Sequence, residues 1–509
     1  MTAKHTLVER AIRATIVSRA TRPDLLLRLT TLVRVLSPEG SPPATTVDGL
    51  LTQASDALRV DQEPQIWLTL AVIAARLPES ADVVAVRRLG ELSGARAVLA
   101  EAIRRMPMEN AGREVEVVTG EVLVDINQLS ETPLMTGIQR VTHETVKRWY
   151  RDHTVSFVCW TKDYFAIRRT TATENARALG KLGTDDGREH DASPLATAVI
   201  PWRCHFILPE VALDVPRTKR LQALVLYSGS ASAVIGFDLV PLTSSETTMS
   251  NVPADFMNGL AAIRHMNRVS TISEAAHAEY DGWRTMLSSI GVPGPEIRTI
   301  SLPVEASEPS PEQVAATRQR YCVPTVPMVL CVGSHEPRKN HLAVLQAAEL
   351  LWRDGVEFSL VFVGGNAWNS GRFQRRLAEL QAAGRPVEAD LGVADDTLWA
   401  LYRVARCTVF PSLNEGFGLP VAESLAIGTP VVTSDFGSMR EIGAGAGALL
   451  VNPRDDRAIA AAVRTLLTND LTHARLVREA AARPSRNWET YASETWDYMV
   501  ETNPLPSGA

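Results

Sequence analysis

The sequence predicts an α/β protein in which two parallel-sheet domains face a common cleft and an all-helical segment precedes them. Three observations support this fold class. Short β-branched runs alternate with helical stretches from about residue 118 onward, a pattern typical of stacked βαβ units. The proline-rich stretch 291–312 divides that region into two series, and the 509 residues exceed what a single hydrophobic core usually organises.

Composition narrows the classes of function. An apolar fraction of 45% and a charged fraction of 22% are ordinary for a globular protein and exclude a disordered or collagen-like chain. The net charge of −6 provides no general field for nucleic acid, so we expect no nucleic-acid partner. Five cysteines without a CxxC pair are typical of reduced thiols. Because no apolar run reaches about 18 residues, the sequence predicts a cytoplasmic protein.

The first 110 residues are predicted to form a bundle of helices, because apolar residues recur there at spacings of three and four. Residues 1–38 contain seven Lys and Arg but two acidic residues, a local excess of +5. Two interpretations stay open: a basic helix that lies peripherally on the anionic inner face of a membrane, and the solvated face of an ordinary bundle. The bundle is also a candidate surface for homo-oligomers.

The remaining chain is predicted to contain two series of strands separated by helices such as 341–353. The first series comprises 120–129, 155–160, 223–228, 231–240 and 268–273, and the second comprises 327–333, 358–365, 407–412 and 429–434. We therefore expect a helical module at 1–110, a first α/β domain at 115–308, a second at 309–480, and a terminal helix with the tail at 481–509. An active site is expected in the cleft between the sheets.

The stretch 410–427 is the most informative, since a glycine-containing loop there joins a strand to a helix. Gly416 and Gly418 let the backbone approach a ligand, and the free amides at the helix start favour a phosphate. Glu415 and Glu423 lie eight positions apart. Beside a diphosphate they are suited to bind hydroxyl groups, one on a sugar and one on a ribose. The alternative is that Glu423 complements the helix dipole while Glu415 is solvated.

A second loop, 333–340, follows the strand at 327–333 and contains two adjacent cations, Arg338 and Lys339. At a strand-to-helix turn these side chains could neutralise the charge of a leaving diphosphate. The alternative is a solvated basic turn. Together with the two glutamates, this loop favours a site for a nucleotide sugar.

In combination these motifs are similar to the retaining GT-B glycosyltransferases of family 4, whose hallmark is two glutamates separated by seven residues. The matching segments are 332–341, 396–402, 411–435, Glu441, 452–455, and 136–140, which resembles the glycine loop of the family's first domain. The similarity covers about residues 118–498, including a helix around Trp488 that in this fold crosses back to the first domain. Residues 1–110 lie outside it.

The resemblance implies a role for each matching position. Glu423 would bind the ribose hydroxyls, Glu415 the donor sugar near its reacting carbon, and Lys339 the diphosphate. Backbone amides from Gly416 through Val421 would contact sugar and phosphate, the loop of Gly137 would close over the phosphates, and Val393 would lie near the base. The donor-binding candidates are thus Gly137, Gly333, Ser334, Arg338, Val393, Gly416, Phe417, Gly418, Leu419, Val421 and Glu423.

Two positions depart from the family pattern. Ser334 stands where many relatives have an arginine, so charge neutralisation would depend on Lys339 with help from Arg338. Phe237 stands where many relatives have a histidine. The adjacent Asp238 becomes a candidate for catalysis or for binding the acceptor or the sugar.

Neither a metal nor a cofactor is expected, and the nucleotide-diphosphate sugar is a co-substrate. The nearest approach to an Asp-x-Asp motif is Asp185–Asp186, in a polar segment typical of a surface loop, and the ten histidines show no chelating spacing. The cations of 333–340 and the helix dipole would supply the electrostatic stabilisation that a metal supplies elsewhere.

The predicted activity is retaining, metal-independent hexosyl transfer from a nucleotide-diphosphate sugar to a glycan or lipid-linked glycan. The two loops resemble those of bacterial mannosyltransferases of surface-polysaccharide assembly, which favours GDP-mannose as donor. Retention is implied by the resemblance, through front-face attack in which the leaving diphosphate takes the acceptor proton. Two alternatives stay open: a GT-B sugar phosphorylase or epimerase, and a non-catalytic assembly component whose helices recruit partners.

Overall fold

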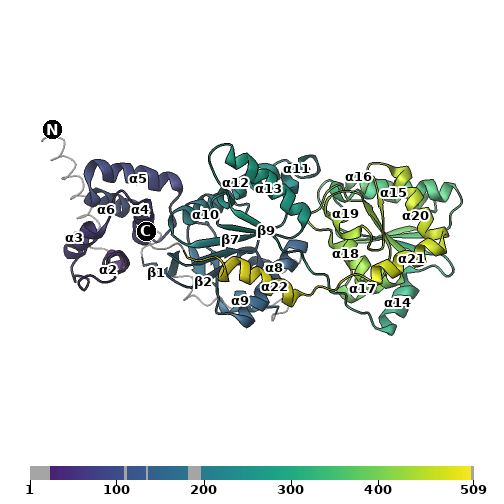
Figure 1. Cartoon of the computed structure of the whole chain (residues 1–509), viewed down its shortest axis with the longest axis horizontal. Coiled ribbons are helices and arrows are strands. Elements are labelled where there is room, and N and C mark those ends of the chain that lie inside the picture. Colours follow the sequence, from purple (N-terminus) through teal and green to yellow (C-terminus); the bar gives the residue numbers. More distant parts are fainter. Residues whose placement is uncertain (1–22, 108–111, 133–135, 181–196, 506–509) are drawn as a thin grey trace.

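The computed structural model describes residues 23–107, 112–132, 136–180 and 197–505. Three parts lie in a row along its long axis, with helices at one end and two α/β domains beyond them (Figure 1). Most of the basic segment 1–38 and the pair Asp185–Asp186 lie outside the described residues. In the part of the chain that is described, no helix is both long enough and apolar enough to cross a membrane.

The helical part packs directly on the first α/β domain. It consists of α2 (Pro23–Leu36), α3 (Val47–Ala57), α4 (Glu63–Ala74), α5 (Ser80–Ser93) and α6 (Ala95–Arg104). Helix α4 is buried from Ile66 to Ala74 because helices cover one side of it and the first domain covers the other. Trp67 of α4 stacks on Trp202 of that domain, with 6.4 Å between ring centroids. The predicted bundle is therefore present, but its apolar core continues into the first domain.

The first domain contains a nine-stranded sheet in the order β1-β5-β4-β3-β2-β6-β7-β8-β9, parallel except at β4. The strands are β1 (Glu114–Val118), β2 (Val122–Asp125), β3 (Ser156–Trp160), β4 (Ile167–Arg169), β5 (Thr197–Pro201), β6 (His205–Leu208), β7 (Ala231–Gly236), β8 (Arg268–Thr271) and β9 (Glu296–Thr299). The helices are α7 (Asn127–Glu131), α8 (Gly137–Asp152), α9 (Ala172–Ala178), α10 (Val215–Tyr227), α11 (Val240–Thr243), the 3₁₀ turn η2 (Ser245–Thr247), α12 (Val252–Ile263) and α13 (Glu274–Ser288).

The prediction of a strand at 223–228 was wrong, since these residues form the last turns of α10. The run ALVLY is apolar without a clear period, and a buried helix segment and a buried strand cannot be told apart from such a run. Helix α10 is apolar on several sides because α4 and α12 both pack against it. The sequence pattern also did not predict β1, β4, β5, β6 or β9, which are only three to five residues long.

The second domain contains a six-stranded, fully parallel sheet in the order β12-β11-β10-β13-β14-β15. The strands are β10 (Met328–Val332), β11 (Ser359–Val363), β12 (Val387–Asp390), β13 (Cys407–Phe410), β14 (Val431–Ser434) and β15 (Ala448–Val451). The helices are α14 (Pro311–Tyr321), the 3₁₀ turn η3 (Pro337–Lys339), α15 (His341–Arg353), α16 (Gly371–Ala382), α17 (Asp395–Val404), α18 (Leu419–Ala426), α19 (Gly437–Gly443), α20 (Asp456–Thr468) and α21 (Asp470–Ala481). Because β10 and β13 are neighbours, the loops that follow them meet at the same edge.

The chain finally returns to the first domain, as the resemblance implies. Helix α22 (Trp488–Trp496) lies along the central domain near α8 and continues into the π-helical turn η4 (Asp497–Glu501) (Figure 1). The indole N–H of Trp149 donates to the Ala492 carbonyl at 2.9 Å, and the ring of His153 stacks on Trp496 at 3.8 Å. The α/β domains are thus joined by two chain crossings, and the predicted fold class of two Rossmann-like domains with a helical segment before them is confirmed.

Candidate active site

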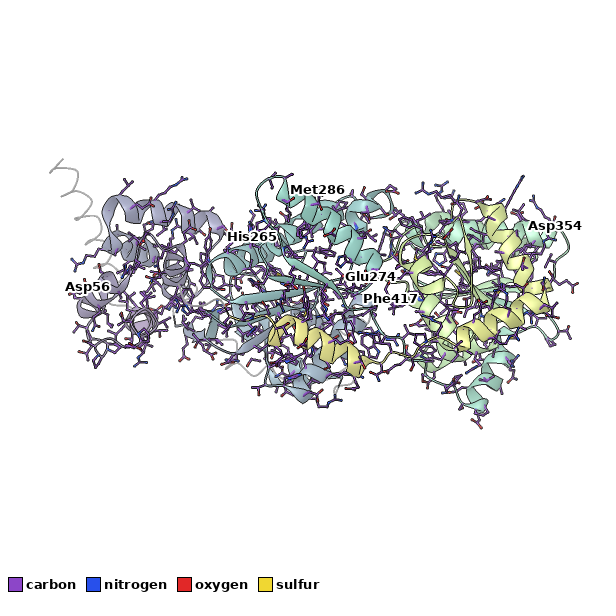
Figure 2. The ribbon with its side chains drawn as sticks, viewed as in Figure 1. Asp56, His265, Glu274, Met286, Asp354 and Phe417 are labelled. Atoms are coloured by element: carbon purple, nitrogen blue, oxygen red, sulfur yellow. The ribbon has the colours of Figure 1, made fainter. Side chains whose placement is uncertain are left out.

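The loop that follows β13 touches the first domain directly. The Ser273 hydroxyl donates to the Gly416 carbonyl at 2.6 Å, and the Asn414 amide donates to the Thr243 hydroxyl at 3.0 Å. Glu441 of α19 accepts hydrogen bonds from the backbone N–H groups of Glu274 and Ala275 at the start of α13. Glu274 and Phe417, labelled in Figure 2, mark the two sides of this junction. The loop with the candidate glutamates therefore lies where the two domains meet.

Two positions in this loop require glycine. A Cβ at Gly416 would lie 2.6 Å from the Phe237 carbonyl oxygen and 2.7 Å from Oδ2 of Asp238, both on the first domain. Gly418 has φ +95°, a left-handed conformation, immediately before α18. The glycines therefore serve the close approach of the two domains and the start of the helix.

Glu415 is the centre of a buried ionic cluster. Its Oε1 accepts from Lys339 Nζ at 2.7 Å and from the Ser412 hydroxyl at 2.6 Å, and its Oε2 lies 2.5 Å from Nη1 of Arg338. Burial alone would raise the pKa of Glu415, but the two cations hold it at about 2. The carboxylate is therefore ionised throughout the neutral range and is not solvated, which excludes the solvated alternative for Glu415.

Both predicted cations face carboxylates. Arg338 also pairs with Glu336 at 2.6 Å, and its carboxylate partners hold the pKa of Arg338 above its usual value despite burial. Burial lowers the pKa of Lys339, with Glu415 opposing the change. Two cations and two carboxylates leave this cluster with no net charge, so it is not a solvated basic turn. A diphosphate that approached Lys339 would compete with Glu415 for it.

Asn340 is one of the residues that fix the loop after β10 to the loop after β13. Asn340 adopts the left-handed conformation, with φ +62°, at the start of α15. Its amide donates to the Pro411 carbonyl at 3.1 Å and to the Pro453 carbonyl at 2.7 Å. These bonds place Arg338 and Lys339 opposite Glu415, although 76 residues separate Lys339 from Glu415 in the sequence.

Glu423 lies in the second turn of α18, where both of its carboxylate oxygens have partners. Nη1 of Arg140 lies 2.8 Å from Oε1, and the Tyr402 hydroxyl donates to Oε2 at 3.0 Å. Burial raises the pKa of Glu423, and these two partners oppose the rise. Gly137 begins α8 against the start of α18, since a Cβ there would lie 3.3 Å from Leu419. The predicted glycine loop of the first domain therefore does lie beside the predicted phosphate-binding helix start.

Asp238 faces the loop of Gly416 from the first domain. Its Oδ1 accepts from the Val240 N–H at 3.1 Å. Burial raises the pKa of Asp238 to about 6, with Glu279 and Glu415 adding to the rise and Arg338 opposing it. Phe237 is buried and packs in the apolar core.

The remaining predicted positions are divided between the loops that follow the strands and the buried core. Gly333, with φ +143°, and Ser334 follow β10 beside the aliphatic part of Lys339. The side chains of Phe417 and Val421 are buried, and the Val421 N–H already donates to the Gly418 carbonyl at 3.0 Å. Val393 follows β12, two strands away from β10, and packs on the cluster around Trp399.

Two partners of this site were not predicted as such. Arg140 and Tyr402 both lie in segments that the sequence singles out, but no spacing connects either of them with Glu423. Among the described residues, no group of three or more His, Cys, Asp and Glu side chains is placed to hold a metal ion. The pair Asp185–Asp186 lies outside the described residues.

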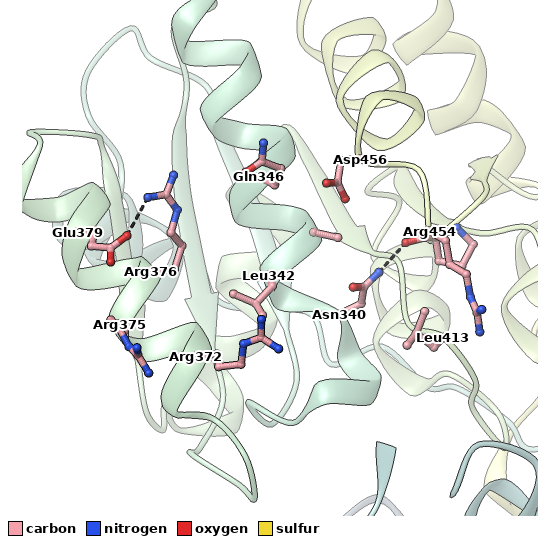
Figure 3. A pocket seen from close by; sticks show the side chains of 12 residues that line it. Asn340, Leu342, Gln346, Arg372, Arg375, Arg376, Glu379, Leu413, Arg454 and Asp456 are labelled. Atoms are coloured by element: carbon pink, nitrogen blue, oxygen red, sulfur yellow. Dashed lines mark hydrogen bonds and ion pairs between the residues drawn. The ribbon is translucent and has the colours of Figure 1, made fainter. Parts of the chain in front are cut away.

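An open cavity of about 660 Å³ lies in the second domain and is lined in part by Asn340 and Leu413 of the two loops. Figure 3 shows it between α16, with Arg372, Arg375, Arg376 and Glu379, and the start of α20, with Arg454 and Asp456. Glu415, Lys339 and Glu423 do not line it, so the cavity is separate from the ionic cluster.

Comparison with known proteins agrees with this geometry. Residues 317–483 match the family model for glycosyl transferases group 1, and this segment contains Lys339, Glu415 and Glu423. The serotype-specific mannosyltransferase WbdA of Escherichia coli is 25% identical over 398 residues, which cover 76% of this chain and 44% of WbdA. O-antigen chain mannosyltransferase B of Escherichia coli is 31% identical over 188 residues, covering 36% of this chain and 49% of that protein. The chain thus spans less than half the length of these curated relatives.

The fold is also found among solved structures. HepE of Anabaena, solved in complex with UDP and glucose, aligns with a TM-score of 0.54 at 13% identity over 75% of this chain and 100% of HepE. At this identity the likeness concerns the fold. Together with the two-domain architecture, it identifies the fold of this chain as GT-B, and residues 317–483 of the second domain match the glycosyl transferases group 1 model.

Proposed function

We propose that the chain is a retaining glycosyltransferase that moves a sugar from a nucleotide-diphosphate donor to a glycan or lipid-linked glycan, in the synthesis of a bacterial surface polysaccharide. The observation that carries the proposal is Glu415, ionised between Lys339 and Arg338, eight residues before Glu423 in a glycosyl transferases group 1 domain. Both curated relatives named above are mannosyltransferases, which favours GDP-mannose as donor. The UDP and glucose bound to HepE make a uridine donor the alternative.

In this proposal each loop binds a different part of the donor. Glu423 takes the ribose hydroxyls after Arg140 moves away, and Glu415 takes a hydroxyl of the donor sugar. The diphosphate binds Lys339 and Arg338, together with Ser334 and the backbone amides of the loop that leads into α18. Asp238 faces the same space from the first domain and contacts the sugar or the acceptor.

The proposed reaction needs no enzymic nucleophile and no metal. The acceptor oxygen bonds to the anomeric carbon on the face that the diphosphate leaves, and the bond from that carbon to the diphosphate oxygen breaks. The departing diphosphate oxygen takes the acceptor proton, so the configuration is retained. The buried cations Arg338 and Lys339 stabilise the negative charge that develops on the diphosphate.

The proposal also keeps the division into a helical module at 1–110, an acceptor domain at 115–308, a donor domain at 309–480 and a crossover segment at 481–509. A cytoplasmic enzyme with peripheral contact to the inner membrane face through residues 1–38 remains a hypothesis. Co-sedimentation of the full chain with anionic and with neutral vesicles tests it. Equal recovery with both kinds of vesicle would rule it out.

A thermal-shift panel of nucleotide sugars, each with and without EDTA, tests donor binding. A donor at about 100 times its Kd should stabilise the fold by roughly 2.7 kcal/mol, with or without EDTA. Glu423→Ala should abolish the shift, while Glu357→Ala, an exposed position in the same domain, should preserve it. Absence of a shift with every nucleotide sugar would overturn the proposal.

Turnover tests the catalytic assignment. Glu415→Ala and Lys339→Ala should each lower kcat by about two or more orders of magnitude, because each removes a group that stabilises the transition state. Near-normal transfer by both folded variants would overturn the site. Phosphate-dependent release of a sugar phosphate without an acceptor would instead identify a phosphorylase.

A further inference from the structure

The first domain encloses a second cavity, of about 230 Å³, whose wall is mostly hydrocarbon. It lies between the sheet and helices α10, α12 and α13. Apolar side chains that line it include Leu213, Val234, Phe256, Leu260 and Ile263. Such a lining favours an apolar ligand, because sugar hydroxyls would lose their water contacts there without gaining protein partners.

This cavity adjoins the candidate active site. Asp238 lines it, and the same side chain lies next to Gly416, the residue that follows Glu415. A ligand that filled the cavity would therefore end in the cleft, close to the loop that carries the proposed catalytic glutamate. The cavity is thus a part of the first domain that an acceptor can reach while the donor occupies the second domain.

Two polar atoms in the lining lack partners. Tyr280 is 3% exposed, and its hydroxyl makes no hydrogen bond with any described residue. Oδ2 of Asp238 is likewise without a hydrogen bond among these residues, since the Val240 N–H donates to Oδ1. The other polar lining groups are satisfied: Gln128 donates to the Val211 carbonyl, and Glu210 pairs with Arg217. A mainly apolar pocket with few unpaired polar groups is typical of a small-molecule site.

We propose that this cavity binds a hydrocarbon group carried by the acceptor, joined to a sugar whose hydroxyls contact Tyr280 and Asp238. The inference rests on the proposed glycosyltransferase function and names the class of acceptor. An engineered protein cavity of about 150 Å³ holds a benzene ring, so 230 Å³ has room for roughly nine carbon atoms. That space exceeds the single methyl group of a 6-deoxy sugar, and we therefore assign it to an alkyl, prenyl or aryl aglycone.

Direct binding to the full chain tests the assignment without any donor. The probes are n-hexyl α-D-mannopyranoside, methyl α-D-mannopyranoside and methyl 6-deoxy-α-D-mannopyranoside, measured by calorimetry. The hexyl glycoside should bind at least tenfold more tightly than either methyl glycoside. Equal affinities, no binding of the hexyl glycoside, or a preference for the deoxy sugar alone would overturn the proposal. Because no nucleotide is present, such a failure is distinguishable from failure to bind a donor.

A matched pair of variants on α12 localises the binding. Leu260→Trp fills the cavity and should reduce the hexyl glycoside to the affinity of the methyl glycoside. Met257→Trp, on the same helix but 52% exposed, should leave the tenfold ratio intact. Equal effects of the two substitutions would overturn the proposal.

Tyr280→Phe keeps the ring and removes only the unpaired hydroxyl, so it provides a test if Leu260→Trp fails to fold. It should weaken both mannosides severalfold and leave their ratio unchanged, because the ratio comes from the hydrocarbon. Unchanged affinity for both mannosides would remove Tyr280 from the site and overturn the proposal as stated.

Discussion

Arg140 of the first domain pairs with Glu423 of the second, with 2.8 Å between Nη1 and Oε1, and so joins the two α/β domains. The Tyr402 hydroxyl occupies the other carboxylate oxygen at 3.0 Å. The residue proposed to hold the donor ribose is thus fully paired before any donor binds. A ribose hydroxyl that displaced one of these partners would displace Arg140, which is 37% exposed, more readily than Tyr402, which is fully buried.

Removing the guanidinium of Arg140 should destabilise the free protein and strengthen donor binding. Arg140→Ala should lower the free energy of unfolding by about 1–3 kcal/mol, because Glu423 stays buried and loses a charged partner. The donor identified by thermal shift should then bind severalfold more tightly, because it no longer competes with Arg140. Urea unfolding and calorimetry measure the two effects. Arg151→Ala, on an exposed part of α8, is the control; tenfold weaker donor binding by Arg140→Ala would show instead that Arg140 contacts the donor.

The ionic cluster around Glu415 predicts a dependence of stability on pH. The folded-state pKa of Glu415, about 2, lies below the unfolded value of about 4.3, so its contribution is present above about pH 4.3 and is lost as the pH falls toward 2. Glu415→Gln should cost on the order of 3 kcal/mol at pH 7, and the difference should shrink between pH 5 and pH 3. Urea unfolding across that range measures it. The exposed Glu357→Gln serves as the control, and a cost for Glu415→Gln that did not change with pH would contradict the assignment.

For Asp238, the predicted dependence of stability on pH has the opposite sign. Its folded-state pKa, raised to about 6, lies above the unfolded value of about 3.9, so stability is lost as the pH rises from about 4 to 6. Asp238→Asn should therefore be more stable than the parent chain at pH 7, by about 1–3 kcal/mol, and equally stable near pH 4. Asp281→Asn, on the exposed side of α13, should show no such gain. If Asp238→Asn were less stable at pH 7, the carboxylate would be a favourable structural contact rather than a strained group at the site.

The loops of the candidate site could be predicted from the sequence because their signals are local. Glycines, a helix start and charged residues occur together after β10 and β13, and parallel neighbours bring such loops to one edge. The cross-domain contacts could not be predicted in this way. The pairing of Arg140 with Glu423 joins residues 283 positions apart, and only the packing of α8 against α18 brings them together.

The errors in the predicted fold also arise from contacts between residues that are far apart in the sequence. Residues 223–228 look like a strand because α10 is apolar on several sides, and it is apolar there because α4 covers its outer surface. The helical segment is readily recognised as helical, but its own periodicity does not reveal that Trp67 packs on Trp202. Local patterns specify the elements, whereas the partner that covers each face depends on residues far away in the chain.

The shared core predicts that the helical part and the first domain unfold together. Trp67 is fully buried and stacks on Trp202, and the guanidinium groups of Arg76 and Arg220 lie 4.6 and 4.4 Å from the centre of the Phe165 ring. Trp67→Ala should lower the free energy of unfolding by about 3–5 kcal/mol, because it leaves a cavity at this junction. Leu92→Ala, in α5 but 86% exposed, should change it by less than about 0.5 kcal/mol.

Urea unfolding followed by tryptophan fluorescence and by circular dichroism distinguishes a shared core from two separate units. With a shared core, Trp67→Ala lowers the urea midpoint measured by circular dichroism and the midpoint measured by tryptophan fluorescence to the same value. The reason is that neither part keeps its buried face without the other. A separate early transition of the helices, with the α/β signal unmoved, would contradict this. In that case the helical part could be detached without harm to the first domain, and the contact between Trp67 and Trp202 would contribute little to the stability of that domain.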